Sequence, residues 1–144
     1  MDKVYAYALK LLNGHDFSVA DLRKRLELKF GIPPDATIQQ LLQKNFLNDR
    51  RFAENYVARR KHRGQAVVRE ELLSHGIPTA LADEVVRQAE WPSLREALGA
   101  KMKGLKLRAP LQLRDAARLF RALQRLGYEE DAIREEIENT NVQQ

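Results

Sequence analysis

Four arginines in the last third of the chain are spaced so that they could act together. Separations of 4, 3 and 4 residues, at about 100° per residue of helix, place them in one narrow stripe; they are Arg114, Arg118, Arg121 and Arg125. Leu119 and Leu123 fall on the opposite side of the same helix. Guanidinium groups pair with phosphate and carboxylate oxygens through two parallel hydrogen bonds. The spacing therefore predicts a surface that binds a polyanion.

The alternative is a solvated face whose arginines pair with acids of the protein itself. Asp115 is the one acid between Lys101 and Arg125, so local partners are scarce. An acidic segment follows and could fold back to neutralise part of the stripe; its acids are Glu129, Glu130, Asp131, Glu135, Glu136 and Glu138. We favour the binding surface and keep a solvated or internally paired face as the alternative.

Two further basic clusters extend this predicted surface. Glycines and a proline loosen the segment before the stripe, and a flexible basic stretch suits phosphate contact as well as it suits a soluble loop; its cations are Lys101, Lys103, Lys106 and Arg108. The other cluster precedes Gly64, where the dipole of a helix C-terminus would by itself favour cations. We expect Arg60 to form a structural ion pair there, and the remaining members to reach a partner, namely Arg59, Lys61 and Arg63.

Residues suited to catalysis are weakly represented. The three histidines lie far apart without metal-ligand spacing, and they are His15, His62 and His75. The chain has no cysteine and no glycine-rich phosphate loop. The abundant acids fit helix caps and pairs along helices. We therefore expect no enzymatic activity, no cofactor and no metal.

The elements that must position these side chains have helical period almost everywhere. Gly31, Gly76 and Gly127 each end a helix-like segment, each precedes a hydrophobic residue, and they lie 45 and 51 residues apart. We expect positive φ at Gly76 and Gly127, as is common just after a helix. A weak period of this size is typical of stacked helical units that share a core. The pattern predicts nine helices in three triplets.

Local signals mark where several of these helices begin and end. Ser18 has the position of an N-cap, with Asp21 three residues later as in a short capping box, and Ser93 has capping-box spacing to Glu96. Either Asn48 or Asp49 could cap the helix of the middle unit. We expect the last helix to run over about 129–138, followed by a frayed tail over 139–144.

Composition limits the class of protein further. Hydrophobic residues make up 44% of 144 residues and charged residues 31%, which is enough for a packed core under a well-solvated surface. The net charge of +5 favours polyanions or acidic proteins as partners. The chain shows neither a signal-peptide pattern nor an apolar run of the ~20 residues that span a membrane. We expect a cytoplasmic protein without a membrane partner.

One stretch of the chain is recognisable as a motif. It reads LNDRRFAENYV over 47–57 and continues through Arg60, Gly64, Val68, Glu71, Leu72, Gly76 and Ile77. This stretch resembles the middle repeat of the RecX family, the bacterial regulators of the RecA recombinase. The resemblance reaches the first repeat through Ser18, Leu22, Leu26 and Gly31, and the third through Trp91, Leu119, Leu123 and Gly127. Asn48 departs from the acid that is usual in the family, but both residue types cap helices.

The resemblance implies an all-α fold of three tandem three-helix repeats in an elongated, curved array, which we place at 1–47, 48–90 and 91–144. It also implies a monomeric, non-enzymatic protein that lies along the groove of the RecA filament on DNA and mainly inhibits recombination. The expected partners are that filament and single- or double-stranded DNA. Two alternatives stay open: a helical module that binds DNA directly, and a helical-repeat scaffold for another protein.

Overall fold

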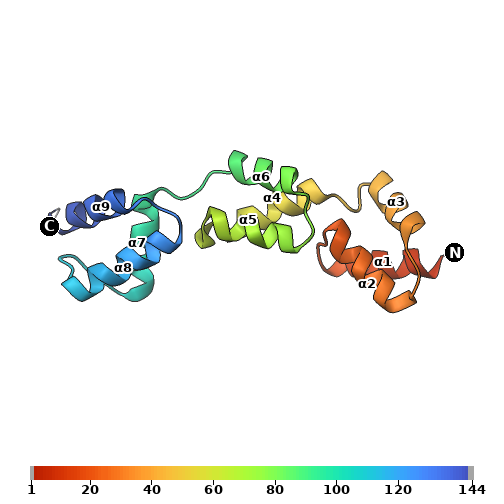
Figure 1. Ribbon diagram of the computed structural model, residues 1–144. Coiled ribbons are helices and arrows are strands. Elements are labelled where there is room, and N and C mark those ends of the chain that lie inside the picture. The colour runs from red at the N-terminus through yellow and green to blue at the C-terminus, as the bar shows by residue number, and fades with distance from the viewer. Residues whose placement is uncertain (1, 143–144) are drawn as a thin grey trace. The chain divides into compact units, whose positions relative to one another are not determined.

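The computed structural model describes residues 2–142, and over this range the chain is all helical (Figure 1). The expected all-α fold is confirmed: the described residues form nine α-helices and one 3-10 turn and contain no strand. In chain order these are α1 (Lys3–Gly14), α2 (Val19–Phe30), α3 (Asp35–Gln43), α4 (Asp49–Arg60), η1 (Lys61–Arg63), α5 (Gln65–Ser74), α6 (Thr79–Gln88), α7 (Leu94–Leu105), α8 (Leu113–Arg125) and α9 (Glu130–Val142).

Side chains just before the helices satisfy their free N–H groups. The Ser93 hydroxyl accepts from the N–H of Glu96, and the Glu96 carboxylate accepts from the N–H of Ser93, so the predicted capping box is confirmed. Asn48 rather than Asp49 caps α4, because its Oδ1 accepts from the N–H of Arg51 at 3.0 Å. An asparagine therefore serves as the N-cap at the position where the motif usually has an acid.

The three glycines end their helices in the way the spacing predicts. All have positive φ: 72° at Gly31, 78° at Gly76 and 101° at Gly127. The N–H of Ile77 donates to the carbonyl of Leu72 at 3.1 Å, five residues back. This hydrogen bond is the signature of a Schellman motif, and the residues around Gly127 form the same one.

The C-terminal helix is longer than the sequence predicts. It continues to Val142, so the predicted end at residue 138 and the frayed tail are wrong over the described residues; Gln143 and Gln144 lie outside them. The side chain of Asn141 accepts from the N–H of Leu111 at 2.7 Å. This hydrogen bond to a segment 30 residues away holds the last turn in place, and a contact of this range cannot be predicted from the local sequence pattern.

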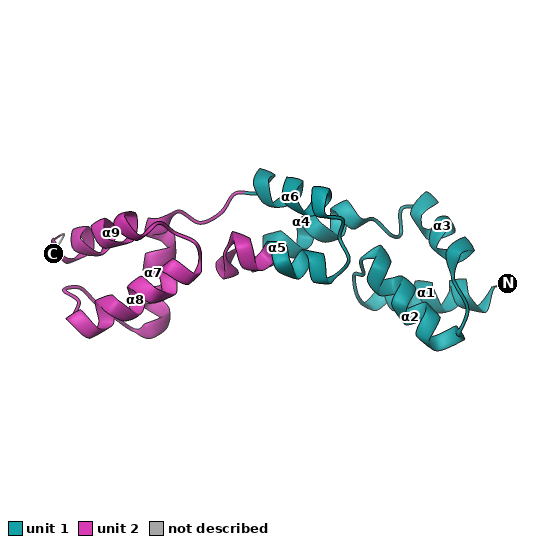
Figure 2. Cartoon of the chain, in the orientation of Figure 1, with its two compact units in different colours: residues 1–59, 69–89 teal, residues 60–68, 90–144 magenta. Residues whose placement is uncertain are grey.

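The helices divide into two compact units, coloured separately in Figure 2. Unit 1 comprises residues 1–59 and 69–89, and unit 2 comprises residues 60–68 and 90–144. In unit 1 the helices α1, α2 and α3 enclose one cluster of buried side chains, which includes Leu22, Leu26, Ile38 and Leu41. The buried stripe of α4 consists of Phe52, Ala53, Tyr56 and Val57, as expected. The three repeat boundaries placed from the sequence stay a prediction.

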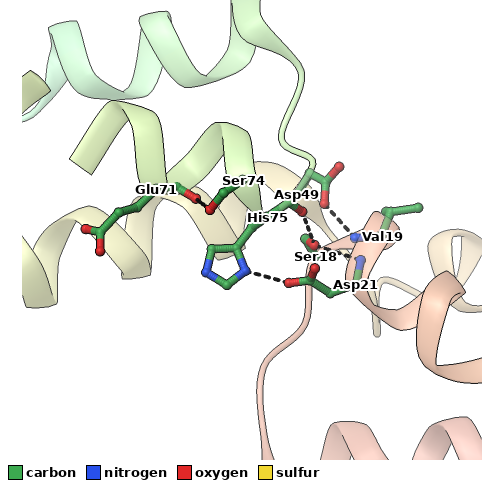
Figure 3. A network of polar contacts seen from close by, with 7 residues as sticks. All are labelled: Ser18, Val19, Asp21, Asp49, Glu71, Ser74 and His75. Carbon is green, nitrogen blue, oxygen red and sulfur yellow. Dashed lines mark hydrogen bonds and ion pairs between the residues drawn. The ribbon is translucent and has the colours of Figure 1, made fainter. Parts of the chain in front are cut away.

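A polar network in unit 1 joins the start of α2 to the end of α5 (Figure 3). The buried Ser18 hydroxyl donates to the carbonyl of His75 at 2.6 Å and accepts from the N–H of Asp21 at 3.0 Å. The carboxylate of Asp21 does not complete a capping box and instead lies 2.6 Å from Nδ1 of His75. Asp49, at the start of α4, accepts from the N–H of Val19 at 2.8 Å.

In unit 2 the helices α7, α8 and α9 pack against one another around a second core. The buried members of this core are Ala97, Leu98, Leu119, Leu123, Ile133 and Ile137. Leu119, Leu123 and Ile133 are fully buried, so α8 can present only its opposite side to solvent. This burial fixes the orientation of the side chains that the sequence marks as a binding surface.

Candidate polyanion-binding surface

The predicted arginine stripe is an exposed face of α8. We use the name arginine face for Arg114, Arg118, Arg121 and Arg125, all of which are exposed to solvent. The fully buried Leu119 and Leu123 hold the other side of the helix against the core of unit 2. The apolar core and the four cations therefore occupy opposite sides of one helix, as their spacing predicts.

The arginine face makes almost no ion pairs with acids of the protein itself. Within residues 2–142 the face makes one ion pair, a long one of 3.9 Å between Arg118 and Asp115. Three acids at or within α9 have other partners. Glu129 accepts from backbone N–H groups at the start of its own helix, Glu130 contacts Gln124 and Arg134, and Glu136 lies 3.6 Å from Arg95.

Exposed arginines that lack close internal partners can bind an anion from outside the protein. The four arginines lie on one side of α8, and each can form a charge-assisted hydrogen bond with an oxygen of a ligand. A polyanion presents such oxygens repeatedly, so several contacts can form at once. The four arginines are therefore largely free of internal pairing, and that they bind a polyanion stays a prediction.

Part of the basic segment before α8 is helical rather than a loose stretch. The predicted loosening by glycines is wrong for Lys101 and Lys103, because α7 runs without interruption through Gly99 and Gly104 to Leu105. Lys106 forms the left-handed C-cap with φ of 58°, and Arg108 follows as an exposed residue. Lys103 is exposed, whereas Lys101 is half-buried and lines a cavity.

The cluster before Gly64 is divided between the two compact units. Arg59 is exposed at the end of α4 and belongs to unit 1. Lys61 and Arg63 form part of η1 and belong to unit 2; Arg63 is exposed and Lys61 is half-buried beside the same cavity as Lys101. This cavity could not be predicted from the sequence, because the segments that line it are far apart along the chain.

The polar network of unit 1 contains the residue types of a hydrolytic triad but not its geometry (Figure 3). In a triad the serine hydroxyl lies beside one ring nitrogen of the histidine while the carboxylate holds the other. Here the Ser18 hydroxyl donates to the backbone carbonyl of His75, and of the serine and the aspartate it is Asp21 whose side chain contacts a ring nitrogen. The histidine ring also packs edge-on against Phe52 and Tyr56. These contacts join helices.

Within residues 2–142 neither a metal site nor a membrane span is found. No cluster of three or more histidine, aspartate or glutamate side chains there has the arrangement of a metal site. No helix in that range has both the length and the apolar character needed to cross a bilayer.

Comparison with known proteins identifies the class. Residues 48–86 match the family model described as the second three-helix domain of RecX. A regulatory protein RecX from Trichlorobacter lovleyi is 31% identical over 144 residues, covering 93% of each chain. Its counterpart from Thermus thermophilus is 34% identical over 125 residues, covering 85% of this chain and 82% of that protein. The similarity therefore extends well beyond the middle motif.

The fold and this similarity together define an all-α regulatory protein built from three-helix domains. The chain belongs to the RecX family.

Proposed function

We propose that this chain is a cytoplasmic, monomeric regulator that binds the RecA recombinase filament on DNA and mainly inhibits recombination. Membership of a family whose members are named regulatory proteins supports a regulatory role. The observation that carries the proposed contact is the arginine face, which is exposed and nearly without internal ion pairs in the described residues. A filament of protein on DNA offers both phosphate and carboxylate oxygens to such a face.

The contacts of the other basic residues are part of the same proposal. We expect the remaining cations to add to filament or DNA binding, and these are Arg59, Lys61, Arg63, Lys101, Lys103, Lys106 and Arg108. In this proposal the protein acts by binding to the recombinase filament, so it needs no catalytic group or cofactor of its own.

The test is recombinase ATPase activity and strand exchange with and without the protein. One variant converts all four residues of the arginine face to glutamate. A matched control converts four other exposed cations, namely Lys3, Lys10, Lys24 and Arg87. Each variant lowers the net charge of +5 by eight, to −3, so a difference between the variants reports position rather than total charge.

We expect the arginine-face variant to lose inhibition and the control to retain most of it. Each phosphate contact contributes about 0.9 to the slope of log affinity against log salt, so the variant's slope should fall by about three to four. Folding should change little, because exposed ion pairs contribute at most ~1 kcal/mol each. If the variant still inhibits strand exchange at wild-type concentrations, the arginine face is only a solvated surface.

The two alternatives give different binding patterns. A filament regulator binds the assembled filament more tightly than it binds naked DNA or free recombinase. A direct DNA-binding module binds naked DNA as tightly as the filament, with steep salt dependence. A scaffold for another protein binds none of the three.

A further inference from the structure

Unit 2 contains a cavity whose lining includes no residue of the arginine face. Its volume is about 830 Å³, within the range of pockets that enclose ligands. The walls come from η1 and the first residues of α5, from the segment at Trp91, from α7, and from the turn between α8 and α9. All these residues belong to unit 2. The backbones pack closely at one point, where a Cβ added to Gly64 would lie 2.8 Å from the carbonyl oxygen of Leu126.

The lining is largely apolar. Trp91, Leu105, Leu126 and Tyr128 supply its large hydrophobic surfaces. The Tyr128 hydroxyl donates to the carbonyl of Pro92 at 2.6 Å, so its polar atom is already bonded and its ring is what remains for a ligand. Leu105 is 37% exposed, although it lies at a concave site. A bulky hydrophobic group that fills an apolar cavity of this size removes apolar surface from water, and this lowers the free energy of the complex.

The charges at the cavity are unbalanced. Lys61 and Lys101 are half-buried on its lining, and neither makes an ion pair or side-chain hydrogen bond within the described residues. Glu96 is the one acid among the described lining residues, and its carboxylate is held in the capping box by the N–H of Ser93. Two half-buried lysines therefore line the cavity, and within the described residues neither is paired with a carboxylate.

We propose that this cavity binds an acidic peptide segment, which inserts one bulky apolar side chain and pairs its carboxylates with Lys61 and Lys101. The apolar walls favour a side chain as the inserted group, and the lysines favour flanking acids. A nucleic acid fits less well, because its phosphates need a continuous basic track, whereas the cavity offers two lysines. The peptide site does not depend on recombinase binding.

Trp91 makes this site directly observable. It is the single tryptophan of the chain and lies on the cavity lining, so its fluorescence reports occupancy without a label. The full-length protein is titrated with a blocked pentapeptide of sequence DEFED. Two matched peptides test its parts: DEAED lacks the apolar side chain, and NQFQN lacks the carboxylates. Inorganic phosphate and oligothymidylate serve as non-peptide anions.

We expect DEFED to give a saturable change in emission, and both matched peptides to bind at least tenfold more weakly. The double variant K61E/K101E should weaken DEFED binding at least tenfold. The double variant K10E/K24E is the matched control, since both lysines are exposed, neither lines the cavity and the change in net charge is the same, and it should leave binding within twofold. If the double reversal disturbs folding by circular dichroism, K61Q/K101Q replaces it with the same expected direction.

Three results would each overturn the peptide site. One is the absence of a saturable signal with DEFED at millimolar concentration. Another is equal affinity for NQFQN, which would make the cavity purely apolar. The third is a lysine-dependent signal from phosphate or oligothymidylate but not from DEFED, which would make it an anion site instead. Because no recombinase is present in this assay, its failure is separate from failure of the proposed regulatory function.

Discussion

The helix-ending glycines Gly76 and Gly127 should differ sharply in their tolerance of a methyl group. Both have left-handed φ, 78° and 101°. A Cβ added at Gly76 would lie closer than 3.0 Å to the Cβ of Ala20 in α2, whereas a Cβ added at Gly127 meets nothing within 4 Å. Gly76→Ala therefore combines backbone strain with steric overlap, and Gly127→Ala has the strain alone.

The two contributions can be estimated separately. A left-handed residue with a Cβ costs roughly 1–2 kcal/mol, and alanine recovers about 0.4–1 kcal/mol by restricting the unfolded chain. The net loss of unfolding free energy for Gly127→Ala is then about 1 kcal/mol. Overpacking of a fixed neighbour adds about 1–3 kcal/mol, because the backbone of α2 must shift to relieve it. Gly76→Ala should lose about 2–4 kcal/mol.

Urea denaturation followed by circular dichroism measures these losses. A double-mutant cycle isolates the overlap, because Ala20→Gly removes the atom that the new methyl group would meet. Ala20→Gly alone should cost up to ~1 kcal/mol of helix propensity. In that background the cost of Gly76→Ala should fall to about 1 kcal/mol, the value expected for Gly127→Ala.

Two outcomes would refute this reasoning. Equal losses for Gly76→Ala and Gly127→Ala would mean that the contact with Ala20 does not restrict residue 76. A cycle without coupling, in which the cost of Gly76→Ala is the same beside glycine as beside alanine, would show that strain alone is responsible.

Two further predictions concern polar groups. Burial raises the pKa of the Asp49 carboxyl above its ordinary value of 3.8, and nearby Asp21 raises it further, although the hydrogen bond from the Val19 N–H opposes both. The Asp49 carboxyl of the folded chain therefore stays protonated to higher pH than that of the unfolded chain, and its ionisation lowers stability as the pH rises above 3.8. Asp49→Asn should raise the melting temperature at pH 7. This stabilisation should vanish below pH 3.8, where the wild-type carboxyl is protonated in both states. Tyr128→Phe leaves the carbonyl of Pro92 without its 2.6 Å donor and should cost about 1 kcal/mol in urea denaturation.

Local features were predictable because their causes lie within a few residues. The capping box at Ser93 and the positive φ at Gly76 and Gly127 follow from spacing alone, and the structure confirms them. The exposure of the arginine face follows from the same argument, since the leucines opposite must be buried. Helical period therefore recovered the fold class and the orientation of its most basic helix.

Long-range pairs could not be read from spacing. Asp21 pairs with His75, 54 positions later, so its carboxylate does not return to the cap of its own helix. The overlap expected between Ala20 and a methyl at position 76 is equally remote in sequence. The cavity of unit 2 is lined by several separate segments, and only the folded chain brings Lys61 and Lys101 to the same lining. Such contacts depend on tertiary packing, which local sequence patterns do not predict.

The segregation of charge between α8 and α9 gives unit 2 an electric dipole. The helix α8 carries four arginines and one aspartate, while α9 carries five acids and one arginine. In the field of a polyanion such a body experiences a torque as well as an attraction, so it would rotate to present α8 before any contact forms. Adding salt should therefore lower the fraction of productive encounters as well as their frequency, because screening removes the torque together with the attraction.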